Sequence, residues 1–404
     1  MKAEPYRMCA SAVTLLVLLC LFPSEGLAGT FPDAHDPPTA GWTGPVFKLS
    51  QDYPSTAPTT GPKPWKSFSF KTQPKQYINS VLTYCLAGNV EHDFELEKNT
   101  VRKWYHAPWM HSTVNGREFV HGLTRERGSR PRELHPNQTS SFQNWAVGMY
   151  NARGGYTIGR VWRDPNSPDA TAAHFSDGTV AFKLLFTDAT VAEVPYLHDG
   201  FEWQAHVTST SSTTRSIRTV RLLQVDVAVR DTRATGTGWV FGTFVYDGDT
   251  PGATPLDRLV PVGLMWGNDP SVTAATAGPS VRLSQTWINP DVGPPQHLGR
   301  AGRLNGPVDN PKSSCMSCHM TAEYKAVSDM IPPTNATTAA TMRWFRNIGA
   351  TTPFDTGQQA LGYSLQLSAG IQRFVAAHPT AIVKAAASAR RPARRIATVR
   401  RGEP

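Results

Sequence analysis

The spacing of hydrophobic positions changes along the chain, and the change separates a helical segment from a series of strands. In residues 76–89, apolar side chains recur three or four positions apart, as on one helix face: Ile78, Val81, Leu82, Cys85 and Leu86. Beyond residue 144, short segments rich in β-branched and aromatic residues alternate with turn residues. This pattern predicts strands at 145–150, 156–162, 179–186, 201–207, 220–229, 239–246, 259–266 and 281–288.

The predicted strands belong to an antiparallel sheet. Val225, Val227 and Val229 alternate with Asp226 and other less apolar residues, as in a strand with one wet face. No alternation of strand and helix runs through residues 145–288, so parallel βαβ units are not expected. Helical patterns return at 313–330, 337–347 and 365–377. The fold class is therefore α+β, with a large antiparallel β-sheet domain and a C-terminal helical segment.

Composition divides the 404 residues into five parts. Residues 1–28 resemble a signal peptide, and residues 29–75 form an extended arm rich in proline and glycine. The β-rich domain covers 76–300, and the helical segment covers 301–378. Residues 379–404 form a basic tail of the composition expected for disorder.

The beginning of the chain predicts export. Lys2 and Arg7 precede an apolar run at 10–22, and Gly26 and Ala28 stand before an expected cleavage site. A run of 13 residues is shorter than the roughly 20 needed to span a bilayer as a helix. We expect a periplasmic protein without a transmembrane anchor.

The net charge of +9 arises mainly in the tail. Residues 379–404 contain seven basic residues and one acid, which leaves a near-neutral body. A basic end on a neutral body is typical of a solvated terminus, so no nucleic-acid partner is expected.

One motif carries chemistry: Cys315, Cys318 and His319 form a C-x-x-C-H sequence. Two thiols three residues apart lie close together on a helical turn, so both can add to the vinyl groups of one haem. The adjacent imidazole can then bind the iron. We expect one covalent haem c, with thioethers at Cys315 and Cys318. His319 is the expected proximal ligand, with Nε2 on iron and Nδ1–H donated to a carbonyl.

Three other interpretations of this motif stay open. A disulfide between Cys315 and Cys318 suits export but gives His319 no role. A thioredoxin-like pair requires a βαβ setting, which the pattern lacks. A zinc site requires four ligands, and Cys85 is the one other cysteine beyond the signal peptide. Cys85 itself lies on an apolar helical stripe, which favours a buried structural thiol.

The residue on the second face of the iron decides between electron transfer and catalysis. Met330 and Met342 follow the motif and are candidate sixth ligands for a six-coordinate carrier. His106 and His111 lie in an aromatic-rich segment before the sheet and are weaker candidates. Without such a ligand, the iron would have an open site.

The motif, combined with the export signal, resembles bacterial c-type cytochromes. The segments 177–183 and 236–246, followed late in the chain by C-x-x-C-H, are similar to the order in the cytochrome P-460 and c′-beta group. This resemblance implies an antiparallel sheet that covers a five-coordinate haem. It also implies that Lys183 is a candidate for the lysine that some members bond to their haem.

Two functions follow as expectations. The first is one-electron transfer by an exported monohaem cytochrome, which needs a redox partner protein. The alternative is a haem enzyme or gas-binding protein with an open distal site, acting on peroxide, a nitrogen oxide or hydroxylamine. A chain far longer than the roughly 100 residues of a small domain argues for a role beyond simple electron transfer or, equally, for a docking scaffold.

Overall fold

The structure is a computed structural model that describes residues 31, 42, 48–110, 121–211, 214–273, 275–276, 282–292 and 298–386. The expected signal peptide, much of the arm and the tail beyond residue 386 lie outside the described residues. Within these ranges, no helix combines the length and apolar character that a membrane span requires.

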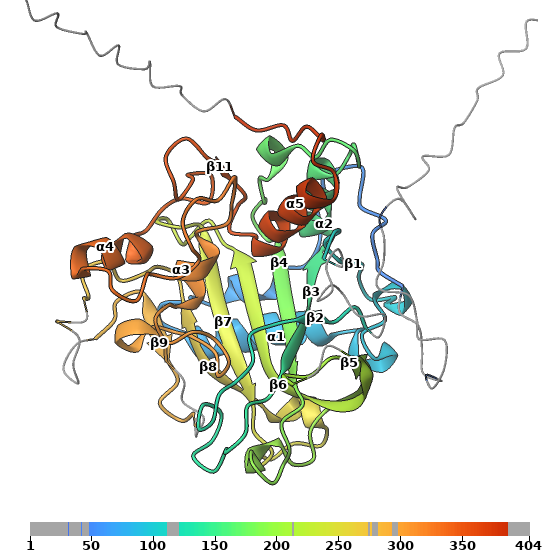
Figure 1. Cartoon of the computed structure of the whole chain (residues 1–404), viewed down its shortest axis with the longest axis vertical. Coiled ribbons are helices and arrows are strands. Elements are labelled where there is room, and N and C mark those ends of the chain that lie inside the picture. Colours follow the sequence, from blue (N-terminus) through green and yellow to red (C-terminus); the bar gives the residue numbers. More distant parts are fainter. Residues whose placement is uncertain are drawn as a thin grey trace, which may run out of the picture.

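An antiparallel sheet of nine strands forms the centre of the described chain (Figure 1). Its order is β1-β3-β4-β6-β7-β8-β9, with β2 also paired to β3 and β5 to β6. The strands are β1 (Trp104–Tyr105), β2 (Thr124–Arg125), β3 (Asn144–Asn151), β4 (Val180–Thr187), β5 (Glu202–Val207), β6 (Ser216–Arg230), β7 (Trp239–Tyr246), β8 (Leu259–Met265) and β9 (Thr286–Ile288). The α+β class and the antiparallel sheet are thereby confirmed.

Helices flank this sheet. The α-helices are α1 (Pro74–Leu86), α2 (Ala152–Val161), α3 (Cys315–His319), α4 (Thr338–Met342) and α5 (Leu365–Ala377). Short 3-10 turns occur at Pro64–Ser67, Val90–His92, Leu96–Lys98, Ala170–Ala172, Pro195–Leu197, Pro255–Arg258, Arg300–Gly302 and Arg343–Phe345. A separate antiparallel pair, β10 (Glu323–Tyr324) and β11 (Gln359–Ala360), lies among the C-terminal helices.

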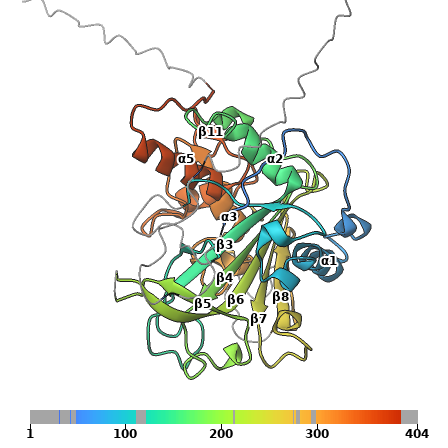
Figure 2. The same ribbon diagram turned by 90° about the vertical axis from the view of Figure 1, so that its right-hand side faces the viewer.

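The two faces of the sheet carry different layers. Helix α1 packs its apolar stripe on one face, where Ile78, Val81 and Cys85 are buried with Phe182 and Val227. Helices α2, α3 and α5 lie on the other face (Figure 2). Because side chains alternate along a strand, Phe241 faces α3 while its neighbour Gly242 faces Ile78 of α1. The site described below lies between the sheet and the second layer.

The strand predicted at 156–162 is wrong, because this segment is helix α2. Asn151 caps the helix: its side chain accepts a hydrogen bond from Gly154 N. Ile158 and Val161 then fall on one buried helical face. A Cβ on Gly155 would come within 2.4 Å of the Tyr105 ring, so these glycines permit close packing rather than a hairpin. The period-2 pattern of a few residues was ambiguous with a helical one.

The predicted C-terminal helices differ in extent. Helix α5 matches 365–377, but the helix expected at 313–330 ends at His319, because the chain leaves it to pair β10 with β11. The 337–347 segment is α4 followed by a 3-10 turn. Of the strand expected at 281–288, Thr286–Ile288 is a strand.

Candidate functional site

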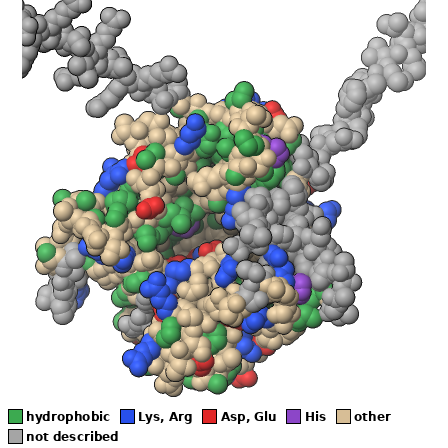
Figure 3. Space-filling model, in the orientation of Figure 1, with side chains coloured by type: hydrophobic (Ala, Val, Ile, Leu, Met, Phe, Trp, Pro, Cys, Tyr) green, Lys and Arg blue, Asp and Glu red, His purple; other side chains and the backbone are tan. Residues whose placement is uncertain are grey.

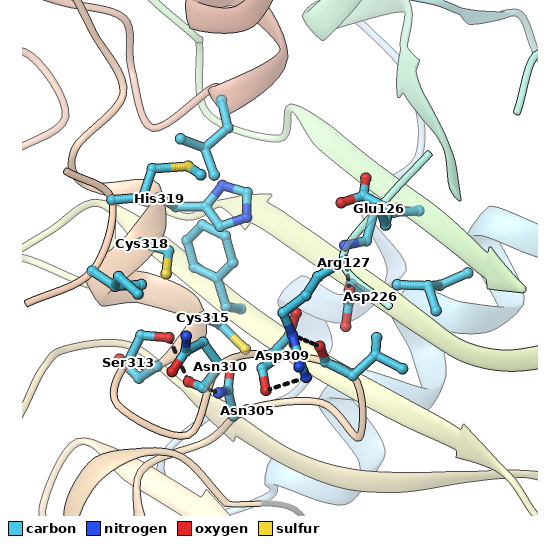
Figure 4. A pocket seen from close by; sticks show the side chains of 18 of the residues that line it. Glu126, Arg127, Asp226, Asn305, Asp309, Asn310, Ser313, Cys315, Cys318 and His319 are labelled. Atoms are coloured by element: carbon cyan, nitrogen blue, oxygen red, sulfur yellow. Dashed lines mark hydrogen bonds and ion pairs between the residues drawn. The ribbon is translucent and has the colours of Figure 1, made fainter. Parts of the chain in front are cut away.

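Helix α3 presents the motif on one short turn. Ser314 caps it: Ser314 Oγ accepts from Ser317 N, and Ser317 Oγ accepts from Ser314 N. Cys315, Cys318 and His319 project from this turn toward one cavity, while Met316 and Ser317 are fully buried beneath it (Figure 4). The structure thus brings the three predicted site residues together at one cavity.

The orientation of His319 is set by its backbone partner. Its Nδ1 lies 2.9 Å from the carbonyl oxygen of Tyr363, so Nδ1 carries the proton and donates it. Burial lowers the pKa of His319 to about 4, which keeps the imidazole neutral at ordinary pH. Nε2 therefore keeps the lone pair that a metal ligand needs.

All three described cysteines are free thiols. Burial raises the pKa of Cys315 well above its usual value and raises the pKa of Cys318 to about 11. A thioredoxin-like pair works through a thiolate of lowered pKa, so this site does not suit that chemistry. Cys85, on α1, is fully buried in the core, and burial raises its pKa, as expected for a structural thiol.

No zinc-like arrangement accompanies the motif in the described ranges. There, no group of three or more His, Cys, Asp or Glu side chains is placed to hold a metal ion. Two thiols and one imidazole on a single turn do not supply four protein ligands. A haem, by contrast, asks for one imidazole at its iron, because the porphyrin supplies the equatorial nitrogens.

A hollow opens between the sheet and the second layer (Figure 3). Its first part, here the thiol chamber, has a volume of about 550 Å³ and is lined by Cys315, Cys318 and His319. The second part, here the arginine chamber, has about 570 Å³ and is lined by Arg125, Arg373 and the inward face of α5. The two share eight lining residues: Glu126, Lys183, Asp226, Phe241, His319, Asp329, Met330 and Leu365.

A row of residues across four strands forms the floor of the hollow. The strand register pairs Gly148 with Lys183, Lys183 with Asp226, and Asp226 with Thr243. At one end of the row, Thr243 Oγ1 lies 3.7 Å from Cys315 Sγ. At the other end, Gly148 lies under the Gln366 amide of α5. The polar face of β6 thus lines the hollow rather than the outer surface.

Charged side chains gather at the centre of this floor. Lys183 Nζ lies 3.2 Å from Asp226 Oδ2, and Thr243 Oγ1 donates to Asp226 Oδ1 at 2.8 Å. Gln224 Nε2 bridges Asp226 and Asp309, at 2.7 Å and 3.3 Å. Burial raises the pKa of Glu126 and of Asp309. The carboxyl groups of Asp226, Glu126 and Asp309 therefore lie around the Lys183 ammonium, in a cavity that His319 also lines.

The residues that the sequence offers as sixth ligands of the expected haem lie in different places. Met330 lines both chambers at the rim. Met342, the last residue of α4, packs against the core and does not line either chamber. His106 is fully buried beside Ser50, whose backbone N–H donates to its Nδ1, also away from the chambers. His111 lies outside the described residues.

The Asp355 carboxylate anchors the loop that carries Met330 through hydrogen bonds and an ion pair. Ser328 N and Oγ donate to this carboxylate, and the Arg343 guanidinium pairs with it. The backbone N–H of Asp355 donates to Glu323 Oε2 at 3.0 Å. Glu323 is buried, and burial raises its pKa to about 7. A titrating carboxyl therefore lies behind the rim of the hollow.

We expect Glu323 to make stability depend on pH. Its folded pKa of about 7 exceeds the ordinary 4.5, so between these values the folded state binds more protons than the unfolded state. The free energy of unfolding should therefore fall as the pH rises from about 4.5 to 7. Glu323→Gln should flatten this slope in urea titrations at several pH values, whereas Glu91→Gln, at an exposed position, should keep it. An unchanged slope in Glu323→Gln would contradict the assignment.

Several residues of the hollow were missed by sequence reasoning. Glu126, Asp309 and Arg373 come from loop or helix positions that carry no motif. Asp226 could have been found from the sequence, because an acid at the centre of a valine-rich strand is unusual for a sheet covered on both faces and indicates a functional position. Lys183 was named from the resemblance alone, and the structure places it beside Asp226 in the lining of both chambers.

Comparisons with protein-family models, curated proteins and solved structures return no match for this chain.

Proposed function

We propose that this chain is an exported monohaem c-type cytochrome whose minimum function is haem binding and one-electron transfer. The observation that carries the proposal is the convergence of both thiols and the unprotonated Nε2 face of His319 on one cavity. A disulfide or a thiolate pair would give no chemical role to the His319 imidazole, which the hydrogen bond to Tyr363 orients.

The residues present fit the cofactor. The thiol chamber falls within the roughly 300–1,000 Å³ typical of ligand sites, and Cys315 and Cys318 retain part of their surface toward it. Cys315 and Cys318 would hold the haem covalently, and His319 would bind its iron. When bound, the haem supplies one-electron exchange between Fe(II) and Fe(III) with a redox partner protein. Tyr363 would keep the imidazole in its ligating orientation.

A second candidate function is a haem enzyme or gas-binding protein with an open site. Lys183 and Asp226 lie on the floor of the hollow that His319 also lines, Phe241 packs against the His319 ring, and Met330 belongs to the exposed rim with 56% of its surface accessible. Lys183 can donate a hydrogen bond to a small polar ligand, and the neighbouring carboxyl groups can hold or release a proton. The resemblance to the cytochrome P-460 and c′-beta group also favours an open site.

The test of the proposed function is the full-length protein matured in a host that attaches haem c. We expect a red protein whose mass exceeds that of the polypeptide by one haem and which titrates reversibly as a one-electron couple. A colourless protein with the bare polypeptide mass would contradict it.

Optical spectra of that protein separate the two candidates. A near-infrared methionine-to-iron band, lost in Met330→Ala and kept in Met342→Ala, together with indifference to carbon monoxide, would establish a six-coordinate carrier. High-spin ferric features and rapid carbon monoxide binding in the ferrous protein would establish the open site.

A further inference from the structure

The row of paired residues on the floor of the hollow leads away from the thiols. It begins at Thr243, beside Cys315, and passes through Asp226 and Lys183 to Gly148. Neighbouring strands lie ~4.8 Å apart, so these three steps span about 14 Å. A haem held by Cys315 and Cys318 would be fixed at its vinyl-derived edge. Because the two propionates belong to the opposite edge of the macrocycle, they would extend away from the thiols.

The far end of this row carries a cation in a half-buried setting. Arg373, on α5, lines the arginine chamber, and its guanidinium donates to the carbonyl oxygen of Met110 at 3.0 Å. Its second contact is the thioether of Met110 at 3.6 Å. No ion pair joins Arg373 to a carboxylate among the described residues. Burial lowers its pKa, and the nearby charge of Glu126 offsets this in part.

Helix α5 supplies amides beside this cation. Leu365, Gln366, Ala369, Gln372 and Arg373 line the chamber, and their spacing places them on one helical face. The absence of a side chain at Gly148 gives Gln366 its room, because a Cβ there would lie 2.0 Å from Gln366 Nε2. The Gln366 amide oxygen has no hydrogen-bond partner within the described chain, so this amide can turn toward a ligand.

We propose that Arg373, with the Gln366 amide, forms a carboxylate-binding site at the far end of the hollow. An arginine fork pairs with carboxylates in two parallel hydrogen bonds, and desolvation strengthens such pairs. The carboxylate comes either from the haem propionates or from a free anionic ligand beside the haem. The first source rests on the proposed function, and the second does not.

The test compares Arg373→Gln, Arg373→Lys and Gln366→Leu in the full-length matured protein. Arg163→Gln is the matched control, since Arg163 is exposed and does not line the hollow. The first readout is the propionate bending band in the resonance Raman spectrum. The second is the dissociation constant for sodium acetate, from haem absorbance or, if no haem is attached, from tryptophan fluorescence.

For haem propionates, we expect the bending band to shift in Arg373→Gln and Gln366→Leu, to return toward the wild-type position in Arg373→Lys and to stay unchanged in Arg163→Gln. For a free anion, we expect an unchanged band and acetate binding about tenfold weaker in Arg373→Gln, with partial recovery in Arg373→Lys.

A protein without haem that still binds acetate through Arg373 would support the carboxylate site while contradicting the proposed function. An unchanged Raman band together with acetate binding that does not depend on Arg373 or Gln366 would overturn the proposal. Gln366→Leu keeps it testable if Arg373→Gln does not fold, because it removes the amide without removing the charge.

Discussion

Replacing both Cys315 and Cys318 with alanine should abolish covalent haem attachment. Each sulfur lines the thiol chamber on the same turn as His319, so each would supply one thioether. The double variant should give no haem-stained band after denaturing electrophoresis and should have the mass of the processed polypeptide. Each single variant should keep at most one thioether, with a shifted haem absorption band.

Cys85→Ala is the matched control for this experiment. Cys85 is fully buried on the opposite face of the sheet and takes no part in the hollow, so its loss should leave haem content unchanged. Haem that stays attached after denaturation in the double variant would show that these sulfurs are not the attachment points. It would also contradict the assignment of His319 as the iron ligand.

Asp226→Asn should destabilise the protein by about 2 kcal/mol and raise the reduction potential of the bound haem. The amide would place an NH₂ group or a neutral oxygen against Lys183, so the ammonium would lose its ion-pair partner and keep only the electrostatic interaction with Glu126 and Asp309 in a poorly hydrated site. A fully buried pair would cost more, but both side chains keep contact with the hollow, with 30% and 23% of their surfaces accessible. Losing a negative charge near the iron disfavours Fe(III).

Urea unfolding and a potentiometric titration measure the two effects. The control is Asp291→Asn, because Asp291 pairs with Lys75 at 3.5 Å with 74% of its side chain exposed. A surface pair of this kind should change stability by no more than about 0.5 kcal/mol. If Asp226→Asn behaved like this control in both measurements, the cluster at the floor would have no electrostatic role.

Elements with a clear period were predictable from the chain. Helix α5 and strand β7 match their predicted bounds, because each has a sustained apolar pattern. The failures lie where the pattern is short. At 156–162 the few apolar residues fit both the two-residue period of a strand and the 3.6-residue period of a helix. The Asn151 cap favours the helix. Beyond His319, pairing of β10 with β11 ended a helix that local propensity would have continued.

The residues of the site also fall into those that local sequence predicts and those that the fold brings together. Cys315, Cys318 and His319 were predictable because their chemistry needs fixed spacing within one helical turn, which is a local property. The rest of the hollow comes from residues far apart in the chain: Glu126, Lys183, Asp226, Asp309 and Arg373.

The sequence by itself determined the helical and strand segments with strong periodicity and the C-x-x-C-H motif, because both depend on neighbours within a few residues. The tertiary structure decided which strand face is covered, that Tyr363 orients His319, and that Met330 rather than Met342 lines the hollow. These outcomes depend on strand register and on packing between distant segments, which no local pattern encodes.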